Sequence, residues 1–216
     1  KDGRMFIADH RQGIVILDPA SGAVTPYIED ADVENFKGPN DLYFADNGDL
    51  WFTDQGQTGL HDPTGRLFRF DGKRLDALIA NIPSPNGLAM APGDRMMYVC
   101  VTRDNALWRV PLSAEGQPYK VGRFIQLSGG LGGPDGMAVG ADGSVFICHV
   151  GMGAVWGFTR LGEPLCRINS CEALGTTNAA FGGPDGKTLF ITDSASGCVL
   201  KAQVPVAGRQ LYSHAD

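Results

Sequence analysis

The chain has 216 residues, enough for one sizeable hydrophobic core, and 43% of them are hydrophobic. Its 18 basic residues against 24 acidic residues give a net charge of −6, and no apolar run is long enough to span a membrane. These values exclude a disordered chain and argue against nucleic acid or a membrane as partner. Five cysteines without a CxxC motif favour buried, reduced thiols and a cytoplasmic location.

One strand-and-turn pattern recurs five times along the chain. Each copy opens with a tight turn rich in Asp, Asn and Gly and continues as an apolar strand, which is typical of a β-hairpin. The turn glycines Gly3, Gly48, Gly143 and Gly186 indicate a repeat of about 46 residues. The five copies occupy residues 2–9, 47–54, 93–101, 142–150 and 185–193.

A second hairpin follows in each repeat. Third strands are predicted over residues 13–17, 66–70, 106–110, 153–158 and 197–202, and looser fourth strands over 120–127 and 164–170. A four-stranded unit that repeats every 40–50 residues or so is typical of a β-propeller blade. A β-sandwich, the alternative, would not explain the near-constant spacing. We therefore predict a single all-β propeller domain over residues 1–216.

The repeat count predicts that this propeller is incomplete. At this repeat length the chain corresponds to roughly 4.7 blades, and the first copy begins at its hairpin without an innermost strand. Because a propeller closes to protect its strand edges, we expect further sequence before Lys1. The alternative is a five-bladed closure in which residues 209–214 donate a strand.

A polar residue recurs just before the innermost strand of four repeats, in the phrases Pro-Asn-Asp, Pro-Asn-Gly, Pro-Asp-Gly and Thr-Asn-Ala. The residues are Asn40, Asn86, Asp135 and Asn178, each about one repeat from the next. Since innermost strands line the central channel of a propeller, we expect these side chains to form a ring of oxygen atoms at one mouth. The alternative is ordinary turn chemistry, for which the same phrases are suited.

Such a ring predicts a binding site for a hard cation. Amide and carboxylate oxygens without nitrogen or sulfur ligands favour Ca²⁺, Mg²⁺ or Mn²⁺ over Zn²⁺. Burial of such oxygen atoms also costs free energy unless a cation or a water molecule binds to them. Asp135 is the only carboxylate among the four aligned positions, so a second acidic ligand is expected.

The stretches that carry these residues resemble the senescence-marker-protein/gluconolactonase/luciferin-regenerating-enzyme (LRE-like) family. The resemblance runs from residue 38 to residue 194 and implies a six-bladed propeller with one divalent cation in its channel. The chain would then lack the first blade and part of the second, and contain about blades 2–6. The matching stretches are GPNDLYFADNGDLWFTD, SPNGLAMAPGDRMMYVCVT, GGPDGMAVGADGSVFICHVGMGAVWGF and TTNAAFGGPDGKTLFITDS.

The resemblance also implies roles for individual residues. Asn86 and Asp135 match two of the family's metal ligands, and Asn40 matches a residue that contacts the substrate or a water on the metal. The third ligand of the family is a Glu of the first blade, and no residue of this chain matches it. Gly38 stands where sugar-lactone members of the animal type carry an Arg, which puts recognition of an aldonolactone through that Arg in doubt.

The activity implied by the resemblance is metal-dependent hydrolysis of a small-molecule lactone. A divalent cation, Ca²⁺ or alternatively Zn²⁺, Mn²⁺ or Mg²⁺, would polarise the carbonyl, and Asp135 would activate a water as general base. Asn40 and Asn178 are expected to orient the substrate. Arg103, which follows a second strand, and His149, which ends one, are further candidate substrate contacts at the same rim. The alternatives are a surface loop residue for Arg103 and ordinary packing for His149. The alternative function is a non-catalytic propeller that binds calcium or a small ligand.

Overall fold

The computed structural model describes residues 3–30, 34–56 and 59–215. These residues form eighteen β-strands, and within them the only helical segments are two short 3₁₀ turns, Thr102–Asp104 and Tyr212–His214. The predicted all-β class is therefore confirmed. Asp2, which opens the first predicted repeat, lies outside the described residues. No helix in the described part of the chain has the length and apolar character that crossing a membrane requires.

The chain divides into two compact units. The first unit comprises Lys1–Asn86 and Leu211–Asp216, and the second comprises Gly87–Gln210. The prediction of a single domain over residues 1–216 stays a prediction.

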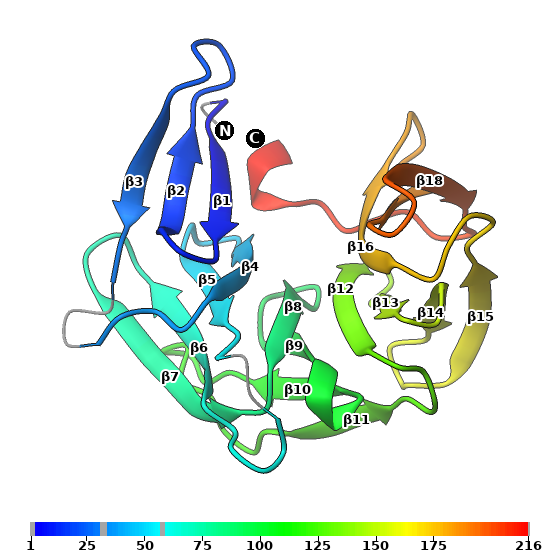
Figure 1. The fold of residues 1–216 in the computed structure, drawn as a ribbon, viewed down its shortest axis with the longest axis horizontal. Helices are drawn as coiled ribbons and strands as arrows, with labels where there is room; N and C mark the ends of the chain where they lie inside the picture. The colour runs from blue at the N-terminus through cyan, green and yellow to red at the C-terminus, as the bar shows by residue number, and fades with distance from the viewer. Residues whose placement is uncertain (1–2, 31–33, 57–58, 216) are drawn as a thin grey trace. The chain divides into compact units, whose positions relative to one another are not determined.

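The first unit contains two antiparallel sheets whose strands follow one another in chain order, and Figure 1 shows the second of them. Apolar residues that alternate along the strands form its core, in which Ile14, Leu50, Phe52 and Phe68 are almost completely buried. The three-stranded sheet is made of β1 (Met5–Asp9), β2 (Gly13–Leu17) and β3 (Val24–Ile28), and the four-stranded sheet of β4 (Pro39–Phe44), β5 (Leu50–Asp54), β6 (Gly65–Phe70) and β7 (Leu75–Ile82).

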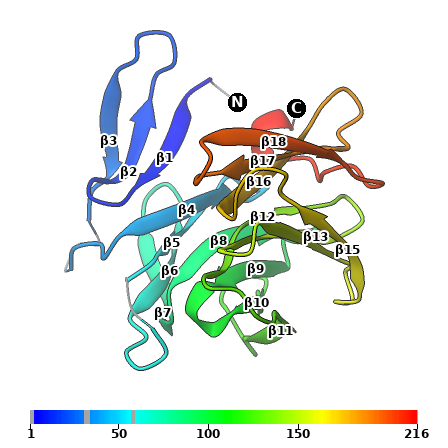
Figure 2. The same cartoon turned by 45° about the vertical axis from the view of Figure 1, so that its right-hand side comes forward.

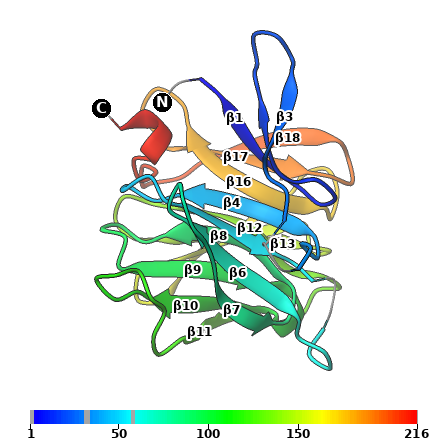
Figure 3. The same ribbon diagram turned by 90° about the vertical axis from the view of Figure 1, so that its left-hand side faces the viewer.

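The second unit contains three sheets of the same kind. Figure 3 shows β8 to β11 as neighbours in the first of them, and Figure 2 shows β16, β17 and β18 side by side in the last. The strands are β8 (Pro85–Met90, which begins two residues before the unit), β9 (Met96–Val101), β10 (Ala106–Pro111) and β11 (Gly122–Gln126); β12 (Gly133–Val139), β13 (Val145–Val150), β14 (Ala154–Phe158) and β15 (Pro164–Asn169); and β16 (Thr176–Gly182), β17 (Thr188–Asp193) and β18 (Cys198–Gln203).

The predicted hairpin turns are found where the sequence places them. In the turn before β13, the Asp142 carboxylate accepts a hydrogen bond from the Ser144 N–H at 3.0 Å, and Gly143 has a φ of +84°. In the turn before β17, the Asp185 carboxylate accepts from the Lys187 N–H at 3.0 Å, and Gly186 has a φ of +67°. These glycines adopt the left-handed conformation that other residues disfavour.

The C-terminal segment does not donate a strand. Its residues 212–214 form a 3₁₀ turn, and the Tyr212 ring stacks on Phe44 with the ring centroids 5.7 Å apart. The alternative of a five-bladed closure through residues 209–214 is therefore wrong, because aromatic stacking on β4 holds this segment in another conformation.

The cysteine prediction is only partly correct. All five cysteines are free thiols, but only Cys100 and Cys148 are buried. Cys166 and Cys198 lie on β15 and β18, the last strands of their sheets, and Cys171 follows β15. Strands at a sheet edge have one side uncovered, so apolar composition alone does not bury Cys166 and Cys198, and Cys171 is exposed in the loop after β15.

Candidate functional site

The four predicted ring residues lie near the starts of β4, β8, β12 and β16, which are the first strands of their sheets. They are therefore strand residues rather than members of isolated turns. An irregular register interrupts three of these strands where the polar phrase occurs. A β-bulge of this kind turns side chains away from the regular alternation and is common beside functional sites. The irregularities fall between Pro39 and Leu42, Pro134 and Met137, and Thr176 and Asn178.

In the second unit, the starts of β8, β12 and β16 pack so closely that only glycine fits between them. A Cβ atom on Gly87 would lie 2.5 Å from the Asp135 carbonyl oxygen and 2.6 Å from Gly136 Cα. A Cβ atom on Gly136 would lie 2.1 Å from Asn178 Oδ1. The fold thus brings Asn178 against the residue that follows Asp135. A ring formed by the predicted side chains stays a prediction.

Asp135 is half-buried, and its negative charge acts on the buried Cys148 thiol. Burial and, second to it, the negative charge of Asp135 raise the pKa of the Cys148 thiol. Cys148 on β13 is completely buried and therefore stays protonated, so it offers no nucleophile. Asp135 is the group at this position that can accept a proton from a substrate or water.

The Asn178 side chain is exposed but has a defined orientation. Its Oδ1 accepts a hydrogen bond from the Ala179 N–H at 2.8 Å, and its own backbone N–H donates to Thr192 Oγ1 at 3.0 Å. Because Oδ1 is engaged by the backbone, the Nδ2 group is the part of the amide that can donate to a ligand.

Arg103 lies in the 3₁₀ turn Thr102–Asp104, which packs against the start of β12. The adjacent Thr102 hydroxyl donates to the Pro134 carbonyl at 2.8 Å, and a Cβ atom on Gly133 would lie 2.3 Å from the Thr102 carbonyl oxygen. The exposed Arg103 side chain is therefore at the same end of the second unit as Asp135. Its contact with a substrate stays a prediction.

His149 is completely buried beneath a glycine-rich loop. Its Nδ1 accepts a hydrogen bond from Trp156 Nε1 at 3.2 Å, and a Cβ atom on Gly130 would lie 2.4 Å from its Nε2. Burial, and after it the nearby Arg167 guanidinium, lower the pKa of His149, which favours the neutral ring. This environment agrees with the packing alternative, and the predicted substrate contact remains untested.

Asn40 and Asn86 belong to the first unit. Asn40 is exposed as the second residue of β4, whereas Asn86 is buried and its carbonyl accepts a hydrogen bond from the Thr53 hydroxyl at 2.7 Å. That they converge with Asp135 and Asn178 stays a prediction.

His10, which stands in its repeat close to where His149 stands in a later one, fills the space beside Gly38. A Cβ atom at position 38 would lie 2.2 Å from Cε1 and 2.5 Å from Nδ1 of His10. The imidazole therefore occupies the room that a side chain at position 38 would need. In the sequence, His10 directly follows the apolar strand that ends at Asp9, and His149 lies near the end of the corresponding strand β13.

Carboxylates at the ends of second strands were overlooked, and they are structural. Asp54 is completely buried, accepts from Arg66 Nε at 2.8 Å and also accepts from the Lys37 N–H at 2.8 Å. Asp193 accepts from the Ser170 hydroxyl at 2.8 Å. The repeated strand-terminal Asp of FTD and ITD was visible in the sequence, but its partners differ: Arg66 lies opposite Asp54 on the next strand of the same sheet, whereas Ser170 comes from the sheet that precedes Asp193.

The donors at the Asp135 end suit a hard cation by type. Asp135 supplies a carboxylate, and the predicted ring adds only amide oxygens. In the part of the chain that the structure describes, no three His, Cys, Asp or Glu side chains gather as a metal cluster. This agrees with the single carboxylate of the aligned positions.

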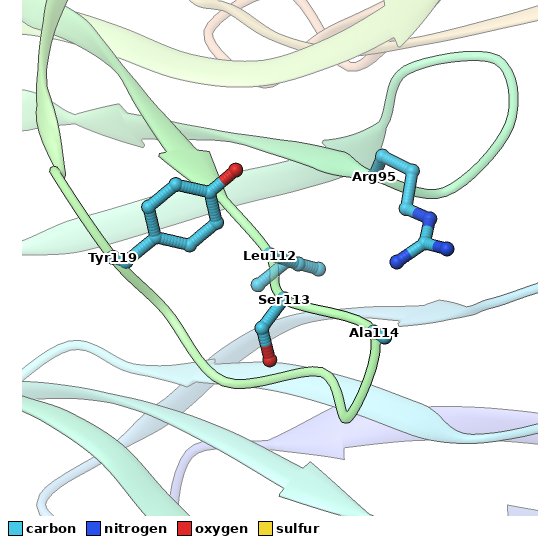
Figure 4. Close-up of a pocket in the computed structure, with 5 residues that line it drawn as sticks. All are labelled: Arg95, Leu112, Ser113, Ala114 and Tyr119. Atoms are coloured by element: carbon cyan, nitrogen blue, oxygen red, sulfur yellow. The ribbon is translucent and has the colours of Figure 1, made fainter.

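A surface depression lies elsewhere in the second unit. Figure 4 shows its lining, in which Arg95 comes from the β8–β9 turn and the other residues from the segment between β10 and β11. Gly87 near the start of β8 lies beside Asp135, whereas these turns lie at the other end of β8 and its neighbouring strands. The depression is therefore separate from the candidate site. The lining residues are Arg95, Leu112, Ser113, Ala114 and Tyr119.

The repeated antiparallel sheets and the polar residues at the starts of their first strands define a protein built from propeller blades. The chain belongs to the SMP-30/gluconolactonase/LRE-like family, whose model matches residues 1–195. The gluconolactonase of Zymomonas mobilis is 30% identical over 96% of this chain, and the 6-deoxy-6-sulfogluconolactonase of Pseudomonas putida is 30% identical over 94% of it. The chain spans 62% of the former protein and 74% of the latter.

Solved structures agree with this assignment. A regucalcin of Agrobacterium tumefaciens, described as a calcium-binding protein, matches with a TM-score of 0.84 and 27% identity over 98% of this chain and 76% of its own. A gluconolactonase of Xanthomonas campestris matches with a TM-score of 0.79 and 25% identity over 94% of this chain and 69% of its own. The predicted β-propeller fold is confirmed.

Proposed function

We propose that this protein hydrolyses a lactone and that Asp135 is the general base. The observation that carries the proposal is the environment of Asp135, a half-buried carboxylate whose strand is wedged between Gly87 and Asn178. A base held in a rigid position can be aligned with a substrate. The relatives named gluconolactonase and 6-deoxy-6-sulfogluconolactonase support the reaction class.

The proposed reaction needs one proton acceptor and groups that orient the lactone. Asp135 takes a proton from a water whose oxygen forms a bond to the carbonyl carbon. The bond from this carbon to the ring oxygen then breaks, and the ring oxygen receives the proton from Asp135. The product is a hydroxy acid. Asn178 Nδ2, together with Asn40 and Arg103, is proposed to donate hydrogen bonds to the substrate.

We further propose that Asp135 and Asn86 hold a divalent cation, because their oxygen donors suit Ca²⁺, with Mn²⁺, Mg²⁺ and Zn²⁺ as alternatives. The likeness to a calcium-binding regucalcin supports a cation in this fold. When bound, such a cation stabilises the negative charge that develops on the carbonyl oxygen.

The same likeness favours a second candidate function, calcium binding without chemistry. An assay of lactone hydrolysis separates the two functions. A pH indicator detects the protons that are released when the hydroxy acid product ionises. The substrates are sugar, aromatic and aliphatic lactones, each with EDTA and with added Ca²⁺, Mn²⁺ or Zn²⁺.

Asp135→Asn is the decisive variant, with Asp185→Asn as its control. Asp185 is an exposed carboxylate in the hairpin turn at the other end of the second unit's last sheet. Removing a general base lowers kcat by about 100-fold or more, while the control should hydrolyse normally. Full activity of Asp135→Asn refutes the base assignment. Calcium binding without hydrolysis of any lactone establishes the second candidate.

A further inference from the structure

Exposed apolar side chains cluster at the Asp135 end of the second unit. Leu131 is 91% exposed and Leu174 is 60% exposed, and Met152 between them is half-buried. Leu131 stands four residues before Asp135, and Leu174 stands four residues before Asn178. The two leucines thus take the same place in successive repeats, next to the two polar residues of the candidate site.

Contacts between loops hold these side chains together. The Gly151 and Gly153 N–H groups donate to the Leu174 carbonyl at 2.8 and 3.2 Å. A Cβ atom on Gly151 would lie 3.4 Å from Leu131 Cβ, and one on Gly129 would lie 3.4 Å from Met152 Cε. The loops 128–132, 151–153 and 170–175 therefore form one continuous rim.

In the first unit, the equivalent apolar residues belong to the core. Phe36, four residues before Asn40, packs edge-to-face on Phe52 and Phe68 with ring centroids 5.4 Å away, and Ile82, four before Asn86, is completely buried. An exposed leucine gives the fold almost none of the free energy that burial supplies. One exposed leucine is ordinary, but a group of apolar side chains beside a polar site indicates a binding surface.

The rim offers few groups that recognise hydroxyls. Residues 128–132 and 151–153 contain no charged side chain, and Glu172 is the charged residue of the third rim loop. The neighbouring turn carries Arg103 and Asp104, and the Asp104 carboxylate accepts hydrogen bonds from Arg123. Resting on the proposed lactonase activity, we infer that the substrate is a lactone with an apolar alkyl or aryl substituent that packs on Leu131, Met152 and Leu174. Polyhydroxylated sugar lactones are then poor substrates, and Leu131 determines this specificity.

A series of γ-lactones with alkyl chains of increasing length tests the inference, with glucono-1,5-lactone as the polar comparison. Each methylene that leaves water on the rim should raise kcat/KM about fourfold until the rim is covered. Leu131→Ser should lower kcat/KM for the longest chain about tenfold and leave the unsubstituted lactone unchanged. Leu161→Ser is the matched control, because Leu161 is 67% exposed in the β14–β15 turn at the other end of the same sheet.

The outcomes separate this inference from the proposed function. A preference for glucono-1,5-lactone, or a chain-length dependence that Leu131→Ser does not flatten, overturns the inference while hydrolysis itself stands. Absence of hydrolysis for every lactone overturns both. A chain-length dependence that weakens in Leu131→Ser and persists in Leu161→Ser supports the inference.

Discussion

The close approach of β8 and β12 makes Gly87→Ala a direct test of how the Asp135 site is built. A Cβ atom at position 87 would lie 2.6 Å from Gly136 Cα. Carbon atoms in favourable contact are about 3.5–4.0 Å apart, so the two strands would have to separate by about 0.9 Å. The atoms that obstruct this Cβ belong to the backbone of β12. A change of rotamer therefore cannot relieve the clash, and Asp135 moves with its strand.

The expected loss of stability follows from two opposing effects. Overpacking of this kind costs roughly 1–3 kcal/mol. Alanine also restricts the unfolded chain, which offsets about 0.4–1 kcal/mol. Gly122→Ala on β11 isolates the second effect, because a Cβ atom there meets nothing within 4 Å. Urea unfolding should therefore show Gly87→Ala to be less stable than Gly122→Ala by roughly 1–3 kcal/mol.

The same displacement should reduce catalysis. A shift of about 1 Å in a catalytic group lowers the rate by about 100-fold, so kcat of Gly87→Ala for the best lactone should fall by this order, with a smaller change in KM. Gly122→Ala should retain its rate. Equal urea midpoints and equal kcat values for the two variants would refute the view that glycine is required here for packing.

Three further outcomes are expected. Arg66→Ala leaves the completely buried Asp54 without its guanidinium, and should cost about 3–5 kcal/mol in urea unfolding. Burial alone would raise the pKa of Asp104, but hydrogen bonds from Arg123 and Trp108 outweigh the effect of burial and lower the pKa. The resulting stability is present above about pH 4 and is lost as the pH falls through the folded-state pKa. The free energy of unfolding of Asp104→Asn should therefore decrease less steeply at acid pH than that of the unchanged protein. Gly186→Ala, at a φ of +67°, should cost about 1–2 kcal/mol in urea unfolding and leave lactone hydrolysis unchanged.

The strands could be predicted because their signals are local. The third strand expected over residues 153–158 is observed as Ala154–Phe158, and that over 13–17 as Gly13–Leu17. Asp-Gly and Asn-Gly turns decide where each hairpin reverses, whatever the rest of the chain does. The 3₁₀ turn of residues 212–214 was missed, because stacking of Tyr212 on Phe44 depends on a residue far away in sequence.

The candidate site could be predicted as a set of positions but not as a set of contacts. The spacing of Asp135 and Asn178 by one repeat was sufficient to expect them at equivalent places in neighbouring sheets. The burial of His149 under Gly130, and the imidazole of His10 over Gly38, depend on loops that are distant in sequence from each histidine. No periodicity within one repeat reports such contacts.

Glycine after an acidic or amide residue serves two different purposes in this chain, although both occur in the same dipeptides, Asp-Gly and Asn-Gly. Gly186 lies in a turn and is needed for its positive φ, with its nearest Cβ neighbour at an ordinary 3.6 Å. Gly87 and Gly136 lie in strands, where the absence of a side chain lets neighbouring strands touch. Turn glycines can be replaced at a cost in stability alone, whereas the strand glycines connect stability to the position of Asp135. The polar phrases thus contain both the chemical group and the glycine that lets the strands pack around it, which is why their recurrence predicts a site.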